Sequence, residues 1–125
     1  MIGSYVVFES TGKAVLKEFE VPQLHSDEVL LENEYTVISA GTERANLIAL
    51  PNTGTSEGGF PFYPGYCGSG RVIATGKDVR NLKAGDRVII AWGGHRSHTI
   101  QKADSVLKIE DDTIDLLDAA FAHIA

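Results

Sequence analysis

Apolar and polar residues alternate with a period near two through the first third of the chain. The alternation runs through SYVVFES, AVLKEFEV and EVLLENEYTVIS, which are separated by the turn-like segments TGK and PQLHSDE. Because successive side chains of a β-strand point to opposite faces, this pattern predicts three strands. The pattern changes after Ser39, where AGTERANLIAL spaces its apolar residues as a short helix does. We expect one or two helical turns over residues 43–49, with Thr42 as the N-cap.

Residues 51–66 are rich in Gly, Pro, Ser, Thr and aromatic residues and are predicted to form a long loop. Strand patterns resume in GSGRVIATG, DRVIIAW, HRSHTIQK and SVLKI. Gly85 and Asp86 suit a turn before a buried strand over residues 88–91, because glycine accepts positive φ and aspartate can bond its own backbone two residues on. Many short strands with turns at this spacing predict a small β-barrel.

The final segment, DDTIDLLDAAFAHIA, is predicted to be a helix with Thr113 as its N-cap and Asp115 in its first turn. Its apolar residues would need a surface to cover them. These residues are Leu116, Leu117, Ala120, Phe121 and Ile124. The segment stops at Ala125 without the glycine, proline or basic last turn that often closes a helix, so we expect the chain to be a fragment of a longer protein.

Composition and charge narrow the classes of function. The 125 residues suit one ordinary domain, and the hydrophobic fraction of 43% is typical of a soluble protein. No apolar run approaches the roughly 20 residues that a membrane helix needs, and the N-terminus lacks the order of a secretory leader. A membrane role is therefore not expected, and the expected location is the cytoplasm. The net charge of −6 disfavours binding to a nucleic-acid backbone. A single cysteine excludes an internal disulfide and a four-cysteine zinc site within this chain.

The segment YPGYCGSGRV holds three glycines around that cysteine and raises the possibility of a phosphate-binding loop. A dinucleotide loop follows a strand and opens a helix with the order G-x-G-x-x-G, whereas these glycines precede a strand pattern. The spacing and the context therefore both disfavour a phosphate site. We expect Gly68 and Gly70 to let the backbone approach a neighbouring segment closely, which a Cβ would prevent.

The order of these features resembles the N-terminal, GroES-like domain of the medium-chain dehydrogenase/reductase family, the zinc alcohol dehydrogenase superfamily. The resemblance rests on SAGTERANL, on YPGYCGSGRVIATGKDVRNLKAGDRV and on ADSVLKIEDDTIDLLDAA. It implies one mainly β, partly open GroES-like barrel with short helices over residues 1–125. It also implies a small-molecule substrate and a Rossmann-type domain outside this chain that binds NAD or NADP, and many members form homo-oligomers. Alone, this chain should not catalyse hydride transfer.

In zinc-dependent members of that family, a cysteine and a histidine from this domain hold the catalytic metal. Carried over by position, the cysteine site falls on Glu43, the histidine site falls on Tyr66, and the next residue, a glutamate in the family, is Cys67. Tyrosine is a poor zinc ligand because its phenol must first lose a proton with a pKa of about 10. We therefore expect a site without zinc. In the alternative, a rearranged zinc site, the ligands would be Glu43 and Cys67.

Without a metal, Glu43 and Tyr66 are the expected acid–base pair, because a carboxylate accepts a proton and a phenol donates a hydrogen bond. Arg44 matches a basic family position near the cofactor pyrophosphate, although a solvated helix arginine has the same sequence signature.

Three further residues, Thr42, Cys67 and His95, are expected to line the substrate cleft. Cys67 is also typical of a small buried hydrophobe, since no basic neighbour in sequence would activate its thiol. His95 follows a double glycine, and its partner at i+3, His98, would point to the opposite face of a strand, so the two should not share a metal ion.

These features favour the substrate-side domain of an NAD(P)-dependent oxidoreductase. Two alternatives stay open. A stand-alone GroES-like module that binds a partner would use the glycine-rich residues 52–59 as a mobile contact segment. A zinc-dependent alcohol or polyol dehydrogenase would differ from the favoured hypothesis only in its metal content.

Overall fold

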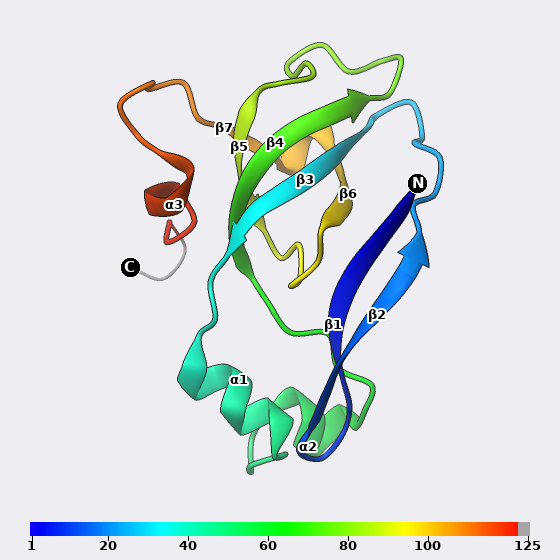
Figure 1. Ribbon diagram of the computed structural model, residues 1–125, viewed down its shortest axis with the longest axis vertical. Helices are drawn as coiled ribbons and strands as arrows, with labels where there is room; N and C mark the ends of the chain where they lie inside the picture. Colours follow the sequence, from blue (N-terminus) through cyan, green and yellow to red (C-terminus); the bar gives the residue numbers. More distant parts are fainter. Residues whose placement is uncertain (123–125) are drawn as a thin grey trace.

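The computed structural model describes residues 1–122 and has the predicted mainly β architecture. Two antiparallel strands, β1 (Ile2–Ser10) and β2 (Lys13–Glu20), form a hairpin. The other strands form one antiparallel sheet in the order β6-β3-β4-β5-β7. They are β3 (Glu28–Thr36), β4 (Cys67–Thr75), β5 (Arg87–Ala91), β6 (His98–Lys102) and β7 (Leu107–Lys108). Figure 1 shows the hairpin beside the curved larger sheet. The two sheets together form the open arrangement expected for a GroES-like domain.

Short helices complete the fold at two places. Helices α1 (Ala40–Leu47) and α2 (Gly54–Gly58) lie together at one end of the molecule, near the turn between β1 and β2 (Figure 1). Helix α3 (Leu116–Ala119) lies beside the larger sheet, and a 3-10 turn, η1 (Ala103–Ser105), precedes β7. Within residues 1–122, no helix is both long enough and apolar enough to cross a membrane.

The start of α1 differs from the sequence prediction. Ser39, not Thr42, occupies the N-cap, and the helix begins at Ala40. The Ser39 hydroxyl makes no capping bond. The carboxylate of Glu43 instead accepts a 2.7 Å hydrogen bond from the Ser39 backbone N–H. The helix can start at Ala40, three residues before the predicted start at residue 43, because the Glu43 carboxylate satisfies a backbone donor at its N-terminus.

The expected long loop contains a helix. Thr53 caps α2 through a capping box with Ser56, in which each side-chain oxygen accepts a hydrogen bond from the other residue's backbone N–H. Thr55 is buried and donates its hydroxyl proton to the Asn46 carbonyl at 2.6 Å, which ties α2 to α1. These bonds give residues 54–58 a defined helical structure within the predicted loop.

The C-terminal helix is shorter than expected and starts later. Asp115, not Thr113, is the N-cap, and its carboxylate accepts a 2.8 Å bond from the Asp118 N–H. Thr113 bonds the Asp111 carboxylate through both its N–H and its hydroxyl, so it belongs to a turn before the helix. Among the predicted apolar residues Leu116 and Ala120 are buried, and Leu117 and Phe121 are exposed. Ile124 lies outside the described residues.

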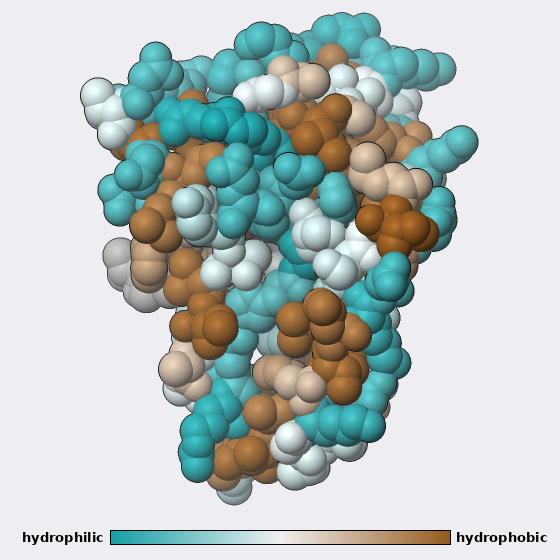
Figure 2. All heavy atoms as spheres, in the orientation of Figure 1, coloured by the Kyte–Doolittle hydropathy of each residue, from teal (hydrophilic) through white to brown (hydrophobic). Residues whose placement is uncertain are grey.

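Aliphatic side chains from the larger sheet and the segments around it form the main core. Its members are Val29, Leu31, Val72, Leu82, Val88, Ile90, Ala103 and Val106. Burying one such large side chain contributes roughly 1.5–3 kcal/mol, so this cluster fixes the sheet from which the site is built. On the face drawn in Figure 2, other apolar side chains reach the surface in separate groups between polar ones.

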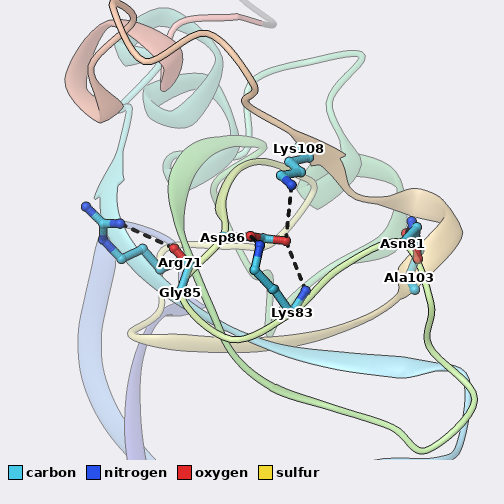
Figure 3. A network of polar contacts seen from close by, with 7 residues as sticks. All are labelled: Arg71, Asn81, Lys83, Gly85, Asp86, Ala103 and Lys108. Carbon is cyan, nitrogen blue, oxygen red and sulfur yellow. Dashed lines mark hydrogen bonds and ion pairs between the residues drawn. The ribbon is translucent and has the colours of Figure 1, made fainter.

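A buried carboxylate at Asp86 joins the turn before β5 to β7 (Figure 3). It accepts hydrogen bonds from the backbone N–H of Lys83 at 3.0 Å and from the Lys83 ammonium at 3.1 Å, and the Lys108 ammonium lies 3.7 Å away. Burial alone raises the pKa of this carboxyl, but these donors and charges outweigh burial and hold the pKa of Asp86 below its usual value. Gly85 has the predicted positive φ, 92°. The Asp86 carboxylate, however, bonds the backbone of Lys83, three residues before it, and not the backbone two residues after it.

Gly68 and Gly70 make the close backbone approaches that the sequence predicts. A Cβ on Gly70 would lie 1.9 Å from the Glu32 carbonyl oxygen, and a Cβ on Gly68 would lie 2.9 Å from the Tyr35 carbonyl oxygen. Both carbonyls belong to β3, the strand paired with β4. The motif around Cys67 is therefore architectural at these two positions.

Candidate active site

A buried hydrogen bond joins α1 to the segment between β5 and β6. Glu43 lies on α1, and its Oε1 is 2.6 Å from Nε2 of His95. The two side chains are 11% and 10% exposed, respectively. A carboxylate and an imidazole this close, and this shielded from water, form a strong charge-assisted hydrogen bond.

A second bond extends this pair to β3. The other ring nitrogen of His95, Nδ1, lies 2.8 Å from the Thr36 hydroxyl oxygen. An ionised Glu43 carboxylate only accepts, so Nε2 must carry a proton, and in a neutral ring Nδ1 then accepts the hydroxyl proton of Thr36. We call this line of three side chains the Thr36–His95–Glu43 chain.

Glycines set the position of the His95 ring. Gly94 has a φ of 77° and Gly65 a φ of 105°, values that favour glycine. A Cβ on Gly65 would lie 2.6 Å from the His95 nitrogen, which leaves room for no other residue. The His95 N–H donates to the Pro64 carbonyl at 3.0 Å, and the His95 carbonyl accepts from the Val6 N–H at 2.8 Å. The double glycine before His95 thus allows the backbone turn that positions its ring.

The Thr36–His95–Glu43 chain borders a cavity of about 540 Å³ between α1 and the β1–β2 hairpin. Most of the cavity wall is apolar, and Arg44 adds one cation. The lining residues other than the chain and Arg44 are Val6, Phe8, Ala14, Ile38, Ala40 and Leu47. A largely apolar hollow with a few convergent polar groups is the usual form of a small-molecule site.

The structure separates Tyr66 from this cavity wall. Its ring packs on Trp92 with ring centroids 5.5 Å apart, and Trp92 is 81% exposed. Trp92 has a φ of 57°, an uncommon conformation for a bulky residue. Glu43 lines the cavity and Tyr66 does not. The two residues expected to act as an acid–base pair therefore do not both face this cavity.

Some of the other predicted site residues line the cavity and others do not. Arg44 lines the cavity, is exposed, and has no ion-pair partner among residues 1–122. Thr42 is exposed on α1 and does not line the cavity, and Cys67 is 3% exposed in β4. His98 bonds Ser97 at 2.8 Å and lies 3.5 Å from a Glu32 carboxylate oxygen, so it does not share partners with His95. Sequence reasoning missed Thr36, which carries no motif signal of its own.

Comparison with protein-family models matches residues 25–114 to the alcohol dehydrogenase GroES-like domain. The chain belongs to this family, the medium-chain dehydrogenase/reductases. An alcohol dehydrogenase of Geobacillus stearothermophilus is 34% identical over 87 residues, which cover 70% of this chain. That alignment spans only 24% of the relative's length.

Solved structures of family members share the fold. The mitochondrial 2-enoyl thioester reductase Etr1p/Etr2p heterodimer from Candida tropicalis matches with a TM-score of 0.77 and 21% identity, over 96% of this chain and 40% of that chain. The Etr1p complex with NADP and crotonyl-CoA matches with a TM-score of 0.74 and 20% identity, over 96% and 40% of the two chains. At these identities the likeness establishes the fold.

The side chains to which the resemblance carries the zinc positions of the family are a poor fit for the metal. Both carboxylate oxygens of Glu43 already accept hydrogen bonds, and Tyr66, at the histidine position, packs on an exposed indole. Cys67 is buried within β4. In the part of the chain that the structure describes, no three His, Cys, Asp or Glu side chains are grouped as a metal site. Zinc in proteins is bound by a tetrahedral set of imidazole, thiolate or carboxylate ligands.

Proposed function

We propose that this chain is the substrate-side domain of an NAD(P)-dependent oxidoreductase that works without catalytic zinc. The observation that carries the proposal is the buried Glu43–His95 pair beside an apolar cavity. Glu43 is the residue to which the family resemblance carries the first zinc-ligand position. The names of the relatives, alcohol dehydrogenase and an enoyl thioester reductase bound to NADP, support the reaction class. The substrate would be an alcohol, a carbonyl or an activated alkene.

In this proposal a nicotinamide bound by the rest of the protein supplies or accepts the hydride. The residues of this chain hold the substrate and manage its proton. Glu43 is proposed to act in proton transfer through His95, because its carboxylate is shielded from water and one of its oxygens is hydrogen-bonded to the imidazole. Tyr66 is a second candidate for proton donation, from the side of the indole of Trp92.

Arg44 is proposed to bind the cofactor pyrophosphate. It is exposed, lines the cavity and makes no ion pair within residues 1–122, so its guanidinium fork is free for paired phosphate oxygens. Its place next to Glu43 would bring the cofactor and the acid–base group to the same end of α1.

Cofactor binding to the intact protein that contains this chain tests the proposal. Titration with NADH and with NADPH, followed by nicotinamide fluorescence, should show saturable binding of at least one. Arg44→Ala should weaken that binding by about tenfold to a hundredfold, the value of a charge-assisted hydrogen bond. Lys77→Ala, which removes an exposed cation elsewhere, is the control. Failure of both dinucleotides to bind would rule out the proposed function.

Elemental analysis of the same preparation tests the metal content. We expect less than a tenth of an equivalent of zinc after dialysis against a weak chelator. One equivalent of retained zinc would instead favour the rearranged site with Glu43 and Cys67 as ligands.

A further inference from the structure

We propose that the Thr36–His95–Glu43 chain is a proton relay in which Thr36, not Glu43, contacts the oxygen atom of the substrate. The inference rests on the proposed function and adds to it the residue that meets the substrate and the kind of substrate that fits. It makes Thr36 a catalytic residue, makes His95 the group that takes up the proton, and makes Glu43 the carboxylate that stabilises the charged ring.

The hydrogen-bond inventory of the three side chains supports this order. Both ring nitrogens of His95 are engaged, by Thr36 at 2.8 Å and by Glu43 at 2.6 Å. The two Glu43 oxygens accept from His95 and from the Ser39 N–H. While the Thr36 hydroxyl donates its hydrogen bond to the ring, its oxygen keeps lone pairs that can accept a hydrogen bond from a substrate O–H.

Burial and position agree with that role. Thr36 is the last residue of β3, is half-buried, and lines the cavity together with Glu43 and His95. A hydroxyl held by a strand end and by the imidazole has little freedom to turn away from the cavity. The relay therefore has one end in the cavity and the other in a shielded carboxylate.

The proton and electron balance of the step is simple for an alcohol. The C–H bond of the carbinol carbon breaks, and its hydride leaves with both electrons to the oxidised nicotinamide. The O–H proton passes to Thr36, the Thr36 proton passes to Nδ1 of His95, and a C=O bond forms. The products are a carbonyl compound, reduced nicotinamide and an imidazolium stabilised by Glu43. Carbonyl reduction runs the same steps backwards.

The cavity wall selects among alcohols. Apart from the relay and Arg44, the wall consists of aliphatic and aromatic side chains, including Val6, Phe8 and Leu47. A substrate with one hydroxyl and an apolar body can bury that body there. A polyol would leave further hydroxyls unpaired against these side chains, which is unfavourable. The structure thus favours monohydric alcohols, or the matching aldehydes and ketones, over polyols.

The test compares Thr36→Val with Thr36→Ser in the intact protein, with linear aliphatic alcohols of increasing length and with glycerol as substrates. Valine keeps the shape of threonine and suits a strand, whereas serine keeps the hydroxyl. We expect Thr36→Val to lower kcat about a hundredfold, and Thr36→Ser to stay within about fivefold of the wild type. Thr75→Val, an exposed strand-end threonine of β4, is the control and should change nothing.

A second readout needs neither turnover nor a variant. In the intact protein with ¹⁵N-labelled histidine, the ring signals of His95 should show a proton on Nε2 and none on Nδ1 in the resting state. A proton on Nδ1 would mean that Thr36 accepts from the ring and would overturn the relay.

The outcomes separate the two proposals. If the wild type turns over substrate and Thr36→Val has the same kcat, the relay is overturned and the proposed function stands. Absence of dinucleotide binding overturns the proposed function and the relay with it. Faster turnover of glycerol than of an aliphatic alcohol overturns the assignment of substrate class.

Discussion

His95 Nε2 lies 2.6 Å from Glu43 Oε1, although the two residues are 52 positions apart in sequence. One comes from a helix after β3 and the other from the connection between β5 and β6. The pair places an imidazole against Glu43, the side chain that the family resemblance assigns to the first zinc-ligand position. In the proposed function, a proton taken up by this imidazole supplies the positive charge beside Glu43.

Glu43→Gln should keep the fold and impair the chemistry. The glutamine amide can still accept from Ser39, but its NH₂ group must donate to Nε2 of His95, which reverses the hydrogen bond to Thr36. We expect an unfolding free energy within about 1 kcal/mol of wild type and a kcat about a hundredfold lower. Glu43→Ala leaves buried donors without partners and should cost about 1–3 kcal/mol in urea denaturation. An alanine variant as stable as wild type would contradict the buried pair.

Tyr66→Phe tests the second predicted acid–base residue. The ring packing on Trp92 is kept, so the free energy of unfolding should change by less than about 0.5 kcal/mol. If the phenol donates a proton, kcat falls about a hundredfold with little change in KM. Tyr35→Phe, at an exposed strand residue, serves as the control. An unchanged kcat in Tyr66→Phe would remove this residue from the reaction.

Asp86→Asn should destabilise the fold by about 1–3 kcal/mol at pH 7. The pKa of Asp86 is lowered in the folded chain, so as the pH falls the unfolded chain binds this proton first, near pH 3.8. The stabilisation by the carboxylate is therefore complete above about pH 5 and is lost as the pH falls through the native pKa. Denaturation of wild type and variant from pH 7 to pH 2.5 should show the two stabilities converging. Asp104→Asn, an exposed carboxyl, should show no such convergence.

Gly70→Ala should prevent correct pairing of β3 with β4, because the new Cβ would sit 1.9 Å from a backbone oxygen of Glu32. Backbone cannot yield as a flexible side chain can, so we expect a loss of more than about 4 kcal/mol or no folded protein. Gly41→Ala is the matched control, since nothing lies within 4 Å of a Cβ there. It should stabilise α1 by about 0.5–1 kcal/mol. Thermal unfolding of both variants decides the matter.

Local periodicity was sufficient to predict most strands, because one buried face imposes alternation, as at Val88 and Ile90 of β5. It was less informative in β3, where Val29, Leu30 and Leu31 are buried in succession. The pairing of β3 with β4 shifts register between Leu30 and Leu31, and a bulge of this kind changes which face a side chain meets. No single-strand pattern contains that information.

Helix starts were harder to predict because several polar residues compete for each cap. Ser39 and not Thr42 is the N-cap of α1, and Asp115 and not Thr113 is the N-cap of α3. In both places the N-cap depends on the path of the chain before the helix, which the local sequence does not specify. The candidate site was harder still. Glu43 and His95 were found one by one, from family position and from a double glycine, but their contact and the role of Thr36 depend on three segments that meet only in the folded chain.

The segment that carries His95 also fastens the β1–β2 hairpin to the larger sheet. The Val6 N–H donates to the His95 carbonyl and the Ser97 N–H donates to the Ser4 carbonyl, each at 2.8 Å. We therefore expect a displacement of this segment to disturb the His95 hydrogen bonds and these two hairpin bonds together. A ligand that holds the His95 segment in place should then also slow hydrogen–deuterium exchange at the Val6 amide, in the neighbouring strand β1.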